Sequence, residues 1–225
     1  MRPVFEKEQR STLTIQALNQ IRKAITSGKI KSGERLVEAD LAKQMQISRF
    51  PIREAICYLE KEGLVVTIPF KGTYVANFNE KDLEEVYTLR SALEELAIRL
   101  LMDNLDSTKI KKLDTIVESM ERATREEKAD KLVLEDMRFH RTICELSGHR
   151  RLLEVWMTLE RQLITFITLE KVHYKDHAKF LKTHYPVVKA IKIGDGHLAE
   201  KTIREHLYEA LEIIAQGYRK TSGNG

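Results

Sequence analysis

One carboxylate and three imidazoles lie at positions where helical spacing could bring them together. Asp136 and His140 are four residues apart, so they share one face of a predicted helix that is otherwise apolar on that face. His184 and His206 each lie beside apolar residues of later helical segments. If these helices pack together, the four side chains could hold a divalent ion such as Zn, Ni or Mn. Taken singly, each is more simply a hydrogen-bonded histidine or a surface carboxylate.

The remaining histidines are not candidates for this site. His173 and His177 also have four-residue spacing, but they lie in the charged, non-periodic stretch HYKDH, which predicts a solvated loop. His149 and His197 are interpreted as ordinary histidines without a ligand role. A metal site in this chain therefore depends on the first four residues alone.

Residues 48–75 have the spacing of a different kind of site, one that reads DNA. Ser48 could cap a helix that has Pro51 in its first turn. Apolar residues then recur at i, i+3, i+4 and i+7 from Ile52, whereas Arg49 and Arg53 lie off that face. The pattern predicts a short helix that buries one side and presents two arginines on another.

The flanking segments supply the rest of a winged helix-turn-helix. Downstream, two β-branched runs at 65–68 and 73–75 flank the tip sequence PFKG, which predicts a basic-tipped hairpin. Upstream, the apolar spacing of Leu18, Ile21 and Ile25 predicts a first helix, and residues 38–45 a second. In such a motif the last helix enters the major groove with its N-terminal residues near the base edges.

Candidate DNA contacts follow from this arrangement. Arginine is the side chain best suited to a bidentate contact with guanine, and helix N-termini suit phosphate oxygens. The alternative is that the two arginines are merely solvated. The predicted DNA-contact residues are Arg35, Ser48, Arg49, Phe50, Arg53, Lys71 and Gly72.

The charge distribution supports a DNA-binding head. Residues 1–78 carry 13 Lys and Arg against 8 Asp and Glu, a net charge of +5, whereas residues 79–225 carry 25 and 26, a net charge of −1. No apolar run is long enough to cross a membrane, so a cytoplasmic protein without membrane association is expected. Cys57 and Cys144 fit no metal or redox spacing and are expected to be buried.

Helical periodicity dominates the rest of the chain. The pattern predicts a mainly α protein in which residues 1–76 form the winged helix-turn-helix, 77–79 a linker, and 80–225 an antiparallel bundle of about six helices. Asn79 could cap the first helix of the bundle, and Thr183 the next-to-last. Asp195 could cap the final helix, which is predicted to reach about residue 215.

Nearly the whole chain resembles the GntR family of bacterial transcription regulators, in the branch with an FCD ligand-binding domain. LVEADLAKQMQISRFPIREAICYLEKEGLV and KGTYV look like the family's reading head, although Phe50 stands where a small residue is usual. LRSALEELAIRL, EDMRFHRTICELSGH, THYPVVKAIKIGD and EKTIREHL look like FCD segments. The resemblance maps the family's metal ligands onto Asp136, His140, His184 and His206. It also implies a small organic acid effector, which Arg90 could clamp unless that residue is an exposed helix arginine.

The sequence thus predicts a sequence-specific transcription regulator, and not an enzyme. We expect a homodimer that binds operator DNA, acts as a repressor by default, and responds to an effector at a metal site. One alternative is a metal-dependent hydrolase-like enzyme that uses the Asp/His site, but the sequence offers no clear general base there. Another is a non-specific nucleoid or scaffold protein, which would leave the inward histidines unexplained.

Overall fold

The computed structural model describes residues 10–170 and 176–222. The chain divides between Asn77 and Phe78 into two compact units, each described below by itself. Among the described residues, no helix is long and apolar enough to cross a membrane.

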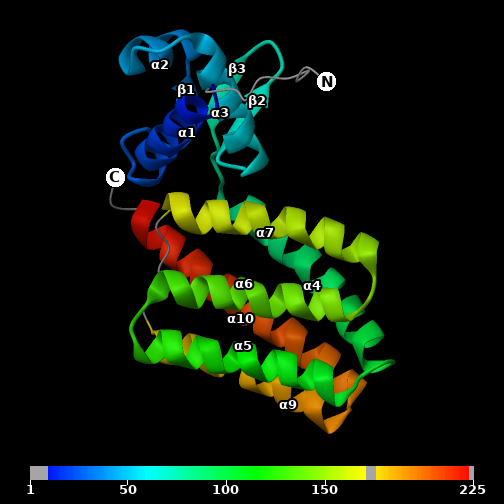
Figure 1. Cartoon of the computed structure of the whole chain (residues 1–225). Coiled ribbons are helices and arrows are strands. Elements are labelled where there is room, and N and C mark those ends of the chain that lie inside the picture. The colour runs from blue at the N-terminus through cyan, green and yellow to red at the C-terminus, as the bar shows by residue number, and fades with distance from the viewer. Residues whose placement is uncertain (1–9, 171–175, 223–225) are drawn as a thin grey trace, which may run out of the picture. The chain divides into compact units, whose positions relative to one another are not determined.

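The first unit is a helix-turn-helix with a small sheet (Figure 1). Its helices are α1 (Arg10–Thr26), α2 (Glu38–Met45) and α3 (Arg49–Lys61). Its strands are β1 (Arg35–Leu36), β2 (Val65–Ile68) and β3 (Gly72–Val75), paired antiparallel in the order β1-β3-β2. The predicted winged motif is therefore confirmed. β1 was not predicted, because two residues are too short to show a period.

Burial of one face explains why α3 forms where it does. Its buried residues are Pro51, Ile52, Ala55, Ile56 and Leu59, opposite Ala17, Ile21 and Ile25 of α1. Gln46 adopts a left-handed conformation, φ 55°, in the tight turn between α2 and α3. The prediction that Cys57 is buried was wrong: it lies on the exposed face of α3, off the apolar stripe.

The second unit is a bundle of seven helices among residues 78–170 and 176–222, one more than predicted. Figure 1 shows α5, α6 and α7 lying alongside one another, while α4 packs against α6, α7 and α10. The helices are α4 (Glu80–Met102), α5 (Ser107–Arg125), α6 (Ala129–Leu146), α7 (Arg150–Glu170), α8 (His177–Lys182), α9 (Tyr185–Ile193) and α10 (Gly196–Ser222). Asn79 and Asp82 form the capping box that starts α4, as predicted for Asn79.

The structure corrects three predictions in this unit. His177 begins the short helix α8, which was predicted as loop because six residues show too little periodicity, while His173 lies outside the described residues. Thr183 ends α8, and His184 occupies the N-cap position of α9 instead. α10 continues past residue 215 to Ser222. Within these extra turns, Arg219 forms an exposed ion pair with Glu80 at the start of α4.

Candidate metal centre and DNA-reading surface

Three helices bring the four predicted ligand residues together inside the second unit. Asp136 and His140 lie one turn apart on α6, His184 stands at the start of α9, and His206 lies on α10. Their exposed fractions are between 0 and 3%. One ligand atom from each residue lies within 4.8 Å of the other three. The structure therefore contains a buried Asp/His group with donor atoms that could hold a metal ion.

The inward-facing nitrogen of every imidazole in this group is Nε2. The His184 Nε2 lies 2.8 Å from Asp136 Oδ1, and the His140 Nε2 lies 3.5 Å from the same oxygen. The Nε2 atoms of His140 and His206 are 3.1 Å apart. Ligand atoms bound at 2.0–2.2 Å to one ion stand roughly 3 Å from their neighbours, so these spacings suit a shared cation.

The outward-facing Nδ1 atoms each meet a hydrogen-bond acceptor. His140 Nδ1 lies 2.6 Å from Glu94 Oε2, and His206 Nδ1 lies 2.9 Å from Thr183 Oγ1. The Thr183 hydroxyl itself donates to the Phe180 carbonyl, so its oxygen can accept from His206. His184 Nδ1 lies 3.3 Å from that same carbonyl. With a metal at the centre, these partners would hold a proton on every Nδ1 and leave every Nε2 lone pair for the ion. Without a metal, Asp136 Oδ1 competes for a proton on His184 Nε2, which lies 2.8 Å away.

Burial and charge set the ionisation of this group. Burial would raise the pKa of Asp136, but hydrogen bonds and charge from His140 and His184 outweigh it and hold that pKa below its usual value. Burial lowers the pKa of His206, and the neighbouring His184 and His140 lower it further. Burial would also lower the pKa of His140, but the Glu94 carboxylate outweighs it and raises that pKa. An anionic carboxylate and a neutral His206 suit a cation at the centre.

Arg90 and Glu94 extend this buried network along α4. The alternative of an exposed Arg90 was wrong, because the side chain is only 1% exposed. Its Nε donates to Glu94 Oε1 at 3.1 Å, and its guanidinium lies 5.0 Å from the Tyr87 ring. Among the described residues, Arg90 Nη2 has no hydrogen-bond partner despite complete burial. An orphaned, buried cationic donor is suited to an anionic ligand.

Sequence reasoning missed Glu94. It accepts from Trp156 Nε1 at 2.7 Å as well as from Arg90 and faces His140. Burial would raise its pKa, but the charges of His140 and Arg90 outweigh burial and lower the pKa to about 2. The available signal was its four-residue spacing from Arg90, a pattern that surface ion pairs share.

A surface hollow of about 290 Å³ reaches the outer side of this group. His206 and Thr183 line it, together with Lys179, Lys182 and Glu205. Of the four residues in the group, His206 is the one that borders this hollow.

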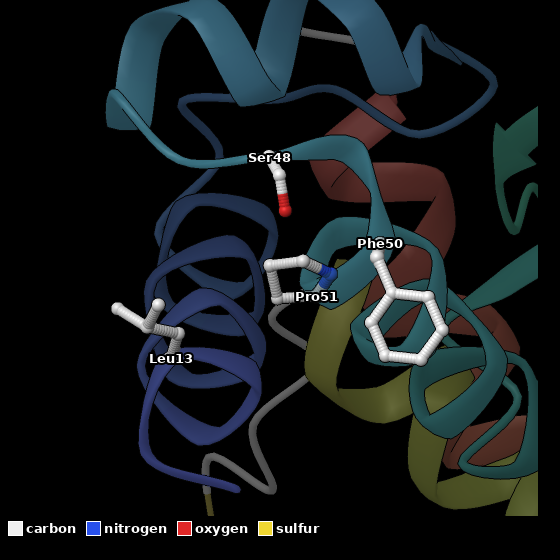
Figure 2. A pocket seen from close by; sticks show the side chains of 4 residues that line it. All are labelled: Leu13, Ser48, Phe50 and Pro51. Atoms are coloured by element: carbon white, nitrogen blue, oxygen red, sulfur yellow. The ribbon is translucent and has the colours of Figure 1, made fainter. Parts of the chain in front are cut away.

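In the first unit, the start of α3 is open to solvent. Figure 2 shows Ser48, Phe50 and Pro51 around a hollow that Leu13 of α1 closes on one side. Ser48 occupies the N-cap position, but within the described part of the chain its side chain makes no capping bond. Its hydroxyl and the free N–H groups of the first turn can therefore contact a phosphate. The Phe50 side chain, 56% exposed, lies at the same place.

The two predicted reading arginines differ in their surroundings. Arg49 is exposed. Arg53 is also exposed but is engaged with α2: its Nε and Nη2 donate to the Glu38 carboxylate at 3.1 and 3.0 Å. A DNA contact by Arg53 would use its remaining Nη1 or exchange Glu38 for DNA.

The tip of the wing is formed by exposed and conformationally unusual residues. Phe70 is fully exposed with φ 61°, and Lys71 is exposed beside it. Gly72 has φ 113°, and a Cβ there would lie 3.1 Å from the Arg35 guanidinium. Arg35 therefore packs against the base of the wing tip. Phe70 was not among the predicted DNA contacts, although it lies within the tip sequence.

Comparison with known proteins agrees with this architecture. Residues 13–75 match the bacterial regulatory proteins of the gntR family, and residues 85–209 match the FCD domain. The gluconate operon transcriptional repressor of Bacillus licheniformis is 31% identical over 88% of this chain and 83% of its own length. YdhC of Bacillus subtilis, an uncharacterized HTH-type transcriptional regulator, is 29% identical over 93% and 94%.

A solved structure shows the same fold. McbR of Escherichia coli superposes with a TM-score of 0.67, at 22% identity, over 92% of this chain and 98% of that one. The matched family and the named relatives are transcription regulators rather than enzymes, so the hydrolase alternative finds no support. The chain belongs to the GntR family of bacterial transcription regulators, in the branch that carries an FCD domain.

Proposed function

We propose that this protein is a homodimeric repressor whose operator binding is controlled by a small carboxylate bound beside a metal ion. The observation that carries the proposal is the pairing of an exposed reading helix in one unit with a buried Asp/His group in the other. The relative named as a gluconate operon repressor supports repression as the default. Operator binding would place the protein in the cytoplasm, with the bacterial chromosome.

The DNA contacts are assigned to the start of α3 and to the wing. Arg49 reads base edges in the major groove, and Arg53 does so when it leaves Glu38. Ser48 and Phe50, at the open N-terminus of α3, contact the phosphate backbone of the DNA. On the wing, Lys71, Gly72 and Arg35 contact a neighbouring stretch of the DNA phosphate backbone. A dimer would place two such heads in successive major grooves of a near-palindromic operator.

The metal ligands are assigned to Asp136 Oδ1 and to the Nε2 atoms of His140, His184 and His206. The support is their burial, their spacing and the acceptors that hold the three Nδ1 atoms. An Asp/His₃ set suits Zn, Ni or Mn, and an ion with five or six ligands keeps positions open for an effector. The metal would supply an electrophilic anchor for the effector's oxygen atoms.

Arg90 supplies the second anchor for the effector. Its buried Nη2 has no partner in the described structure, and a carboxylate oxygen would satisfy it. Gluconate, in the name of one relative's operon, is a hydroxy acid of the chemistry that a metal and an arginine would recognise together. The effector can alter DNA binding only by binding one conformation of the dimer better than another.

The experiment that tests this function is selection of metal-loaded protein on a random DNA pool at a stated salt concentration, followed by sequencing. Enrichment of a short two-fold symmetric site is expected, and metal analysis should find about one ion per chain. The enriched site then serves to screen small carboxylates for release of DNA. No enriched site with or without added Zn²⁺, Ni²⁺ or Mn²⁺ would overturn the operator assignment.

A further inference from the structure

Neither the sequence spacing nor the comparison with known proteins assigns a role to the buried residue Glu94. Its side chain is 0% exposed, and three donors surround it on α4, α6 and α7. Oε1 accepts from Arg90 Nε and Trp156 Nε1, and Oε2 accepts from His140 Nδ1 at 2.6 Å. We propose that Glu94 is a positioning residue that holds a proton on His140 Nδ1, and so directs the Nε2 lone pair to the metal. This inference rests on the proposed metal site.

The chemistry of the three donors requires a carboxylate at this position. A carboxylate has two acceptor oxygens and no hydrogen, so it can satisfy Arg90, Trp156 and His140 together. A glutamine has one oxygen and one NH₂ group. If its oxygen keeps Arg90 and Trp156, its NH₂ faces His140 Nδ1. That nitrogen must then become an acceptor, which moves the ring proton to Nε2 and removes the lone pair that faces Asp136 and His206.

A purely structural role for Glu94 makes a different prediction. Glu94 also neutralises Arg90, which is buried near the Tyr87 and Trp156 rings. If that were its only role, Glu94→Gln would lower the stability of the fold but leave the tautomer of His140 and the metal affinity unchanged. The two roles therefore separate in measurements made on the metal site itself.

The variant experiment compares Glu94→Gln and Glu94→Asp with Glu95→Gln in the full chain. Glu95 is the matched control, because it pairs with Arg204 and Ser91 outside the network. Zn²⁺ affinity is measured by competition with a chromophoric chelator, and Co²⁺ coordination by visible absorption. Glu94→Gln should lose about 10- to 100-fold in Zn²⁺ affinity and change the Co²⁺ spectrum. Glu94→Asp, which keeps the carboxylate, should recover part of the loss, and Glu95→Gln should match the wild type.

A second measurement on the wild-type chain covers the case of a variant that fails to fold. Long-range ¹H–¹⁵N correlation of the imidazole groups reports which nitrogen of His140 carries a proton. A proton on Nδ1, both without metal and with Zn²⁺, supports the role of Glu94. A bare Nδ1 in either state overturns it, as does a Glu94→Gln protein with wild-type Zn²⁺ affinity and Co²⁺ spectrum. A wild type that binds neither ion would instead refute the proposed metal site, and the metal-free tautomer would still decide the role of Glu94.

Discussion

The Nε2 atoms of His140 and His206 face each other at 3.1 Å, although the two residues lie on different helices and 66 positions apart. With a proton on each Nδ1, two inward lone pairs at this distance repel unless a proton on His140 Nε2 or a metal ion lies between them. An ion here would also bind His184 and Asp136, and so cross-link α6, α9 and α10. Metal binding should therefore stabilise the fold of the second unit.

Metal loading should raise the thermal unfolding temperature of the wild type. An ion that binds only the folded chain adds about 2.7 kcal/mol at a free concentration of 100 Kd, and each kcal/mol raises Tm by roughly 2–4 °C at this chain length. Asp136→Asn should lose this response, because it removes the anionic ligand without changing the size of the side chain. Calorimetry with and without Zn²⁺ measures the change in Tm for the wild type and for Asp136→Asn.

The control for that experiment is His197→Ala, which removes an exposed histidine from the same helix as His206. It should keep the full Zn²⁺ response. An equal response from Asp136→Asn would show that the stabilising ion binds elsewhere on the chain.

Loss of Arg49 should weaken binding to the selected operator by about 1–3 kcal/mol and relax base preference at one position of the site. The reason is that Arg49 is exposed at the open start of α3, where it can donate to guanine. Fluorescence anisotropy of Arg49→Ala on operator and scrambled duplexes measures the change. Arg150→Ala, an exposed arginine of the second unit, is the control. Equal losses on operator and scrambled duplexes would mean that Arg49 contacts only phosphate.

Release of Arg53 from α2 should strengthen DNA binding. Glu38→Gln replaces the charged partner of Arg53 with a weaker acceptor, so the guanidinium can exchange more readily to DNA. We expect a higher affinity for the operator, and a smaller gain on a scrambled duplex, because Arg53 is assigned to base edges. Anisotropy on both duplexes measures the two affinities. If the Glu38→Gln and wild-type proteins bind the operator equally, Glu38 does not hold Arg53 away from the DNA.

The sequence predicted the helix-turn-helix and the shared helix face of Asp136 and His140 because both depend on local spacing, whereas the grouping with the other two histidines drew its support from the family resemblance. Asp136 and His140 are one turn apart, and the face of α3 repeats every three to four residues. The partners that determine the chemistry were not predictable in this way. Glu94 reaches His140 across 46 positions, and Arg53 reaches Glu38 across 15, through contacts that only the packed structure brings about. The short helix α8 was missed for want of periodicity.

Gly72→Ala should lower the stability of the first unit more than Gly33→Ala does. Both glycines have positive φ, 113° and 74°, so an added Cβ strains the backbone at each. At Gly72 the Cβ would also lie 3.1 Å from Arg35 Nε, whereas at Gly33 its nearest neighbour is 3.7 Å away. We expect each variant to lose about 1–2 kcal/mol, with the larger loss and a displaced Arg35 in Gly72→Ala. Denaturant unfolding compares them, and equal losses would mean that Arg35 moves aside freely.

Phe70→Gly should leave the fold as stable as the wild type, or more stable by up to about 1 kcal/mol. The Phe70 side chain is fully exposed, so its removal takes away no buried contact, and its φ of 61° is one that glycine adopts without strain. Any loss of operator affinity in this variant would therefore come from a missing contact with DNA rather than from a disturbed wing. Unfolding and anisotropy on the same sample separate the two effects. Lower stability in Phe70→Gly would show instead that the ring packs against the protein in solution.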